Sequence, residues 1–107
     1  MSFQFGPISR SSRLPMIVNF YASLRKIVGA KAVTFDVLGG SSVQQLINII
    51  DTQYPELGEE LMDNNGRLYS HVHVFVNGYD VTSLENRFDT VLSDQDTIDI
   101  FPAVVGG

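Results

Sequence analysis

Hydrophobic and polar residues alternate along three stretches of the chain, which are residues 16–22, 33–37 and 72–76. A period of two is typical of a strand with one face on a core and one face turned away from it. A fourth hydrophobic run, over residues 97–101, follows a polar turn and is also expected to be a strand. The turn residues Gly29–Lys31 separate the first two stretches, so we expect these to pair as a hairpin.

The middle of the chain has the spacing of an amphipathic helix. Its apolar residues recur at i, i+3, i+4 and i+7, and they are Val43, Leu46, Ile47 and Ile50. Ser42 and Gln45 form a capping-box pattern at the start of this helix, and Pro55 is expected to end it. A further short helix is predicted over residues 56–62, before a polar turn.

Turns and one short extended piece make up much of the remaining chain. Asn77–Gly78 is a strong signal for a tight turn, and residues 80–82 are expected to be extended. The predicted order is therefore two strands, a helix, a short helix and three strands. One amphipathic helix needs one sheet face to cover, so we predict a two-layer α+β domain. A mixed sheet packed on one main helix in this order is the β-grasp (ubiquitin-like) arrangement.

We expect three segments along the chain. Residues 1–15 form a flexible N-terminal extension, residues 16–102 the β-grasp domain, and residues 103–107 a flexible C-terminal Gly-Gly tail. The extension is rich in serine and interrupted by proline, so a secretory signal is not expected. A disordered leader, or an upstream start codon with Met16 as the functional start, is favoured over an organellar transit peptide.

The composition narrows the classes of function. The 107 residues have room for one core, and the lack of cysteine excludes disulfides, thiolate nucleophiles and cysteine metal ligands. The 12 acidic residues outnumber the 7 basic ones, which argues against nucleic acid and favours partners with basic surfaces. No apolar run reaches the roughly 20 residues of a membrane span, so we expect a cytoplasmic protein with no membrane partner.

The chain ends in Gly106 and Gly107, directly after a predicted strand and a short linker. Glycine has no Cβ, so such an end can pass in extended form through a channel closed to bulkier residues. The α-carboxylate is then the reactive group at the tip. Extended, residues 104–107 span at most about 14 Å. This pattern indicates a tail that enters the active site of another protein.

Three segments resemble a known family, and they are Phe20–Arg25, Val76–Gly78 and Asp96–Gly107. They resemble the first-strand signature, the central Val-Asn-Gly and the closing Phe-Pro-Pro-Val-x-Gly-Gly of the MoaD-like small subunits of molybdopterin synthase, particularly archaeal-type members. These proteins belong to the ubiquitin-like sulfur carriers, and the resemblance covers residues 16–107. Ala103 stands where the family usually has a second proline, which predicts a less stiff linker, and the leader has no counterpart.

The resemblance implies a function in the biosynthesis of a molybdenum or tungsten pterin cofactor. In that family an E1-like enzyme uses ATP to adenylate the C-terminal glycine, which becomes a thiocarboxylate and donates its sulfur inside a MoaE-like large subunit. Gly107 would be the adenylated and thiocarboxylated residue, with Gly106 providing clearance. The chain would bind no cofactor and would be the sulfur-donating, non-catalytic subunit of a heterotetramer.

The strand alternation also predicts a docking surface. If the valines and isoleucines of the strands face the helix, aromatic side chains lie on the opposite sheet face, where exposed apolar residues mark partner sites. The family docks its partners through this face. The predicted partner-binding residues, including the linker to the tail, are Tyr21, Phe75, Phe101, Pro102, Val104 and Val105. The alternative is that the leader or the irregular segments cover these aromatics.

Other functions stay open. The same activated glycine could be joined to lysines, as in a ubiquitin-like modifier, or could serve tRNA thiolation, and a plain interaction module is a third interpretation. A carrier for thiazole synthesis is disfavoured, because those chains are usually shorter and lack a segment like residues 54–70. His71 and His73 lie two apart on a predicted strand, but the sequence places no third ligand beside them, so no metal site is expected.

Overall fold

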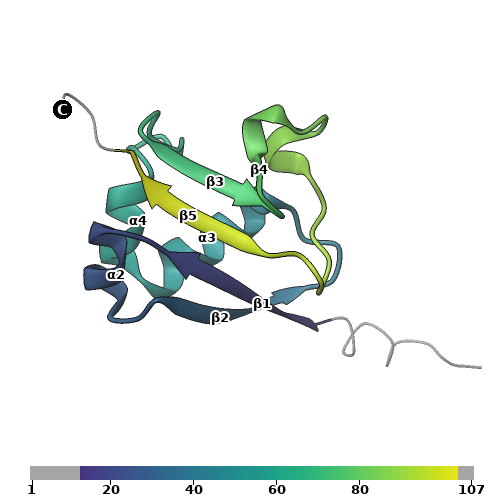
Figure 1. Cartoon of the computed structure of the whole chain (residues 1–107), viewed down its shortest axis with the longest axis horizontal. Coiled ribbons are helices and arrows are strands. Elements are labelled where there is room, and N and C mark those ends of the chain that lie inside the picture. The colour runs from purple at the N-terminus through teal and green to yellow at the C-terminus, as the bar shows by residue number, and fades with distance from the viewer. Residues whose placement is uncertain (1–12, 104–107) are drawn as a thin grey trace, which may run out of the picture.

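The computed structural model describes residues 13–103, whose five strands form one mixed sheet in the order β2-β1-β5-β3-β4 (Figure 1). The strands are β1 (Arg13–Phe20), β2 (Ala32–Leu38), β3 (Val72–Val76), β4 (Tyr79–Asp80) and β5 (Ile98–Pro102). The helices are α2 (Ser23–Val28), α3 (Val43–Gln53) and α4 (Pro55–Leu61), with two 3₁₀ turns, η1 (Val81–Ser83) and η2 (Arg87–Asp89). β1 and β5 are parallel, and the other paired strands are antiparallel. The predicted α+β fold of the β-grasp type is confirmed.

The core lies between the sheet and the helices α3 and α4, which lie behind the sheet in Figure 1. Alternate residues of β1 are fully buried there, and they are Met16, Val18 and Phe20. The four apolar residues predicted for the main helix are buried on the other side of the core. Phe20 and Phe35 meet edge to face, with 6.3 Å between their ring centroids. The predicted helix face and strand alternation are therefore confirmed.

The start of α3 has the predicted capping box. The Ser42 hydroxyl accepts a hydrogen bond from the Gln45 backbone N–H at 3.2 Å. The Gln45 side-chain oxygen in turn accepts one from the Ser42 backbone N–H at 2.8 Å. Each bond satisfies a backbone donor that the first helical turn would otherwise leave unpaired. Pro55 begins α4, where its missing N–H costs no hydrogen bond.

The first strand begins earlier than the alternation predicted, at Arg13 instead of Met16. Pro15 lies inside this strand, although proline cannot donate a hydrogen bond to a neighbouring strand. The pairing with β2 directs the Pro15 nitrogen to the side of β5. Because β5 begins only opposite Val18, no ladder bond is lost at Pro15.

The first strand also ends earlier than predicted, at Phe20 instead of Ala22. Ala22 has a φ of 56°, which breaks the extended backbone and leads into α2. The sequence pattern does not predict this helix, which has six residues and no side-chain cap at its start. Gly29, with a φ of 78°, ends it and leads into β2. The hairpin of β1 and β2 is confirmed, with α2 inside its connection.

The extended piece predicted over residues 80–82 is confirmed only at Asp80, the last residue of β4, whereas Val81 and Thr82 lie in η1. The tight turn Asn77–Gly78 is confirmed, and β4 follows it, but β4 ends at Asp80. The Asp80 carboxylate accepts hydrogen bonds from the Thr82 backbone N–H at 2.8 Å and from the Thr82 hydroxyl at 2.7 Å. These local bonds compete with strand pairing and fold the chain into η1.

Candidate docking face and carboxyl-terminal exit

The structure brings the three predicted docking aromatics together on the sheet face opposite the helices. Phe101 is the central residue, with its ring centroid 6.2 Å from that of Tyr21 and 5.3 Å from that of Phe75. His73 joins them at 5.4 Å from Phe101. We call Tyr21, His73, Phe75 and Phe101 the outer aromatic cluster. Sequence reasoning missed His73 as a member, although its alternation with Val72 and Val74 places it on this face.

A cavity of about 470 Å³ lies against the cluster. Its lining consists of Tyr21, Ala22, Phe75, Asp99, Phe101 and Pro102. Tyr21 is 37% exposed, whereas Phe75, Phe101 and Pro102 are half-buried. A partner's apolar side chain could therefore gain buried area here without displacing a side chain of the core.

The cluster is held from one side by a hydrogen-bond network. The Asp99 carboxylate accepts a hydrogen bond from the Tyr21 hydroxyl at 2.9 Å and another from the Asn19 amide at 3.0 Å. The Arg25 guanidinium lies 5.0 Å from the centre of the Tyr21 ring and donates to the Phe20 carbonyl at 2.7 Å. Hydrogen bonding to Asp99 is the main cause that raises the pKa of the Tyr21 hydroxyl above its ordinary value. Tyr21 is thus a fixed part of the face.

This pKa shift yields a test of the network. Asp99→Asn removes the negative charge and is expected to lower the pKa of Tyr21 toward its ordinary value, as an NMR titration of the tyrosine ring would measure. Because the folded-state pKa is raised, the stabilisation by this bond is present at neutral pH and is lost as pH rises through that value. An unchanged Tyr21 titration in Asp99→Asn would show that the hydrogen bond is not formed.

Ala22 has a backbone conformation that alanine rarely adopts. Its φ of 56° and ψ of −131° lie in a region accessible chiefly to glycine. Strain of this kind costs on the order of 1–3 kcal/mol and often accompanies functional sites. Ala22 lines the cavity beside the outer aromatic cluster, where the turn aims Tyr21 at Phe101.

Replacing Ala22 with glycine is expected to stabilise the protein. The relief of strain exceeds the added flexibility of the unfolded chain, so the free energy of unfolding should rise by about 1 kcal/mol. Urea denaturation measures this change. Ala30→Gly is the matched control, because Ala30 lies in a turn without positive φ and should lose stability. A loss of stability in both variants would contradict the strain at Ala22.

The chain leaves the sheet beside this face. β5 pairs with β3 as far as Pro102, and the Ala103 backbone N–H then donates to the His71 carbonyl at 2.6 Å. A proline at position 103 could not make this bond. At this residue the departure from the family pattern provides an additional hydrogen bond, and the predicted loosening of the linker stays a prediction for the residues that follow. Val104, Val105, Gly106 and Gly107 lie outside the described residues.

A comparison with protein families matches residues 18–107 to the model of the ThiS family. The chain belongs to the ThiS family. This match covers the outer aromatic cluster, the exit at Ala103 and the terminal glycines. The family includes ubiquitin-like sulfur carriers, which agrees with the resemblance of the terminal motif.

Among curated proteins, the ThiS-family chain is 31% identical over 90 residues to small archaeal modifier protein 3 of Haloferax volcanii, covering 84% of this chain and 96% of that protein. It is 32% identical over 81 residues to the sulfur carrier protein CysO of Mycobacterium tuberculosis, covering 74% and 83%. Among solved structures, the crystal structure of SAMP1 from H. volcanii matches with a TM-score of 0.76 and 26% identity, covering 87% of this chain and 99% of that one. Relatives of this ThiS-family chain therefore include both protein modifiers and a sulfur carrier.

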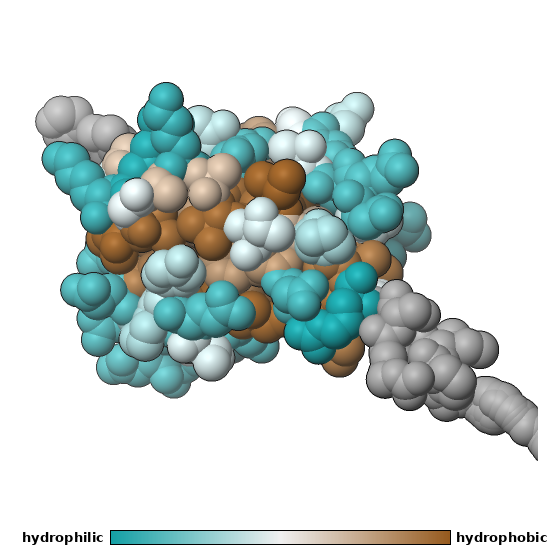
Figure 2. All heavy atoms as spheres, turned by 90° about the horizontal axis from the view of Figure 1, so that it is seen from below, coloured by the Kyte–Doolittle hydropathy of each residue, from teal (hydrophilic) through white to brown (hydrophobic). Residues whose placement is uncertain are grey.

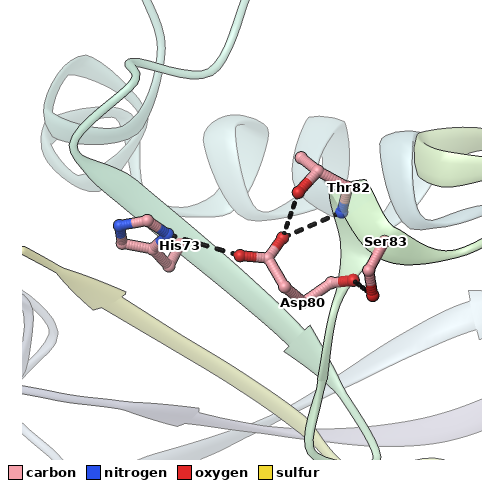
Figure 3. A network of polar contacts seen from close by, with 4 residues as sticks. All are labelled: His73, Asp80, Thr82 and Ser83. Carbon is pink, nitrogen blue, oxygen red and sulfur yellow. Dashed lines mark hydrogen bonds and ion pairs between the residues drawn. The ribbon is translucent and has the colours of Figure 1, made fainter.

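The two histidines of the ThiS-family chain have separate environments. The His73 Nδ1 lies 3.5 Å from the Asp80 carboxylate (Figure 3), whereas His71 stacks on Tyr69 with 5.4 Å between ring centroids. Within residues 13–103, no group of three or more metal-ligating side chains gathers in one place. The same part of the chain contains no helix long and apolar enough to cross a membrane.

Proposed function

We propose that this chain is a sulfur carrier loaded at Gly107, and that it serves as the MoaD-like small subunit of molybdopterin synthase. Its partners would be an E1-like adenylating enzyme, which uses ATP, and a MoaE-like large subunit, which receives the sulfur. The chain itself would bind no cofactor. The observation that carries this proposal is the position of the exit, where the chain leaves the sheet directly beside the outer aromatic cluster.

The proposed chemistry needs only an accessible carboxylate on this chain. A carboxylate oxygen of Gly107 attacks the α-phosphorus of ATP, pyrophosphate leaves, and an acyl-adenylate forms. A sulfur donor then attacks the carbonyl carbon, AMP leaves with the electrons of the broken C–O bond, and a thiocarboxylate results. Adenylation is needed because a free carboxylate is a poor electrophile at neutral pH. Acid and base groups belong to the partner enzymes.

The exit geometry supports delivery over a short range. The hydrogen bond from Ala103 to the His71 carbonyl fixes the last described residue to the residue that precedes β3. The remaining four residues reach at most about 14 Å. A partner bound to the outer aromatic cluster would therefore receive the terminal carboxylate within a narrow range of positions. This arrangement suits an active site close to the docking site.

A protein modifier is the second candidate function. The similarity to small archaeal modifier protein 3 favours it, because that relative matches over nearly its whole length. The activation step would be the same, but a lysine amine of a target protein would replace the sulfur donor and form an isopeptide bond. The C-terminal glycine would then remain attached to the target.

Intact mass spectrometry separates these candidates. The full chain is incubated with the E1-like enzyme of its own organism, ATP and a sulfide donor. A sulfur carrier gains the mass difference between sulfur and oxygen at its terminus, and the variant lacking Gly107 does not. Conjugates to lysine of other proteins, without any thiocarboxylate, would instead assign the modifier function. The absence of both products would reject both candidate functions.

A further inference from the structure

The edge of the sheet formed by β2 is open within residues 13–103. In that part of the chain β2 pairs with β1 alone and stands last in the strand order. Every second residue of β2 is exposed along the whole strand, and these residues are Ala32, Thr34, Asp36 and Leu38. The opposite edge is different, because η1 packs against β3 there and Val74 is only 1% exposed. An open strand edge is a template for another extended backbone.

The register with β1 identifies the backbone groups that face the open edge. The Phe20 N–H donates to the Lys31 carbonyl at 2.8 Å, so the pair that these two residues form is hydrogen-bonded. Because the pairing alternates along an antiparallel ladder, every second residue from Lys31 onward bonds to β1. The residues between them, Thr34 and Asp36 among others, therefore direct their N–H and C=O groups to the open side. An added strand would use these groups.

The same edge has exposed apolar surface. Figure 2, which views the molecule from this side, shows hydrophobic residues gathered across its middle. Within β2, Leu38 is 56% exposed and Val33 is only half-buried. Apolar surface beside unpaired backbone groups favours a partner that covers both together.

The acid at the centre of this edge is already paired. An uncompensated charge on an edge strand often prevents the binding of a further strand. Here the Asp36 carboxylate lies 3.2 Å from the Arg13 Nε, and the same guanidinium donates to the Asp36 carbonyl at 3.4 Å. The Arg13 side chain therefore extends from β1 to the open edge. An added strand would meet an ion pair there, with no net charge.

The sequence of β2 fits a second copy of itself in one antiparallel register. With Phe35 opposite Phe35 of the other copy, Thr34 lies opposite Asp36, and Leu38 lies opposite Ala32. Side chains of such opposed pairs are close enough to interact. The threonine hydroxyl can then donate to the aspartate carboxylate, and the two exposed apolar residues cover each other. A shift by two positions loses these pairs, because Asp36 then faces either Asp36 or Ala32 of the other copy.

We propose that the open edge of β2 binds the same edge of a second copy of this chain, in the antiparallel register that places Thr34 opposite Asp36. A two-fold axis perpendicular to the sheet relates the copies, so each contact occurs twice. The Arg13 guanidinium, which reaches the edge, lies beside Asp36 of the other copy as well as its own. The two sheets join into one continuous sheet.

This pairing leaves the proposed docking site uncovered. The outer aromatic cluster centres on Phe101 in β5, and the chain leaves the sheet between β5 and β3, whereas the contact lies at β2. The second copy therefore goes beyond the loading of Gly107 and does not depend on it. It is compatible with a sulfur carrier and with a modifier.

The dimer is expected to be weak. Each copy has a net charge of −5, and like charges oppose association except where salt screens them. One pair of strands also buries less area than the interface of a stable dimer. We expect a dissociation constant between about 100 µM and 1 mM in buffer with about 0.15 M salt.

Hydrogen exchange of the full chain, followed by NMR at about 20 µM and about 2 mM, tests the proposal. The exchange of the Thr34 and Asp36 amides should be about two- to fivefold slower at the higher concentration, as mass action requires for such a dimer. The Phe35 amide bonds to β1 and should exchange much more slowly than its neighbours at both concentrations. Sedimentation velocity over the same range should show the dimer directly.

Two variants of Thr34 separate the backbone bond from the charge. Thr34→Pro removes an N–H that faces the open edge and no bond to β1, so two lost bonds should weaken the dimer about thirtyfold. Thr34→Glu keeps this N–H but places a second acid opposite Asp36, and should weaken the dimer about fivefold. Thr97→Glu makes the same charge change at an exposed residue before β5 and should associate like the original chain. Urea denaturation checks that each variant is folded.

Three results would overturn the proposal. A chain that stays monomeric at 2 mM would exclude the second copy, and a dimer that both Thr34 variants leave unchanged would place the contact elsewhere. Equal protection of the Thr34 and Asp36 amides at both concentrations would assign the edge to another segment of the same chain. None of these measurements involves the modification of Gly107, so their failure would leave the proposed function standing.

Discussion

Phe101→Ala is expected to raise the KM of an E1-like enzyme for this chain about thirtyfold, with little change in kcat. Phe101 contacts the other three members of the outer aromatic cluster, so its removal opens the centre of the proposed docking face. Central aromatic anchors of interfaces contribute about 2 kcal/mol or more, which corresponds to this factor. The terminal carboxylate and its chemistry are untouched, so saturating carrier should restore the rate.

Two controls separate docking from folding. Tyr79→Ala removes an aromatic ring that is 65% exposed on the β4 hairpin, outside the cluster, and should leave the KM unchanged. Phe101→Leu retains most of the half-buried apolar volume and should have an intermediate KM. Urea denaturation checks that each variant is folded at the assay temperature. A folded Phe101→Ala protein with the KM of the original chain would refute docking through this cluster.

Phe20→Ala is expected to have the largest effect on stability, lowering the free energy of unfolding by about 3–5 kcal/mol. Phe20 is fully buried and packs edge to face on Phe35, which in turn packs on Tyr54 at 6.0 Å. Removing the ring leaves a void between the sheet and the helices. The free energy of unfolding of a small domain is only about 5–15 kcal/mol, so this loss would be a large fraction of the stability of the protein.

Phe75→Ala is the matched control for the core variant. Phe75 is also an aromatic strand residue, but it lies half-buried on the outer sheet face. Its removal should cost about 1 kcal/mol and act mainly on docking. Equilibrium unfolding in urea measures both variants under the same conditions. If Phe75→Ala cost more stability than Phe20→Ala, the assignment of the two sheet faces would be wrong.

The elements that the sequence predicted well have strong local periodicity or a local hydrogen-bond pattern. Buried alternate residues identified β1 and β3, and the pair Ser42 and Gln45 located the start of α3 to the residue. The same alternation placed Tyr21, Phe75 and Phe101 on one face, where the structure finds them in contact. Patterns that depend on neighbours in sequence are therefore sufficient for most of the fold and for the docking face.

The features that the sequence did not predict depend on contacts between distant segments. Asp99 joins the site through hydrogen bonds to residues almost eighty positions away in the chain, which no local pattern encodes. α2 is a single short helix, and the chain enters it through a positive φ at Ala22. Alanine rarely adopts this conformation, so the sequence does not indicate it. β4 ends where the Asp80 side chain accepts a hydrogen bond from the Thr82 backbone N–H, which competes with strand pairing. In the sequence alone, Asp80 is equally compatible with an extended strand.

The modification of Gly107 by a partner enzyme is most directly tested by ATP–pyrophosphate exchange with the E1-like enzyme of the same organism. Three chains are compared: the full chain, the chain lacking Gly107, and the chain with one alanine added after Gly107. Exchange with the full chain, and none with the other two, is the predicted result. Equal exchange with all three chains, or no exchange with any of them, would contradict a function based on loading this terminal carboxylate.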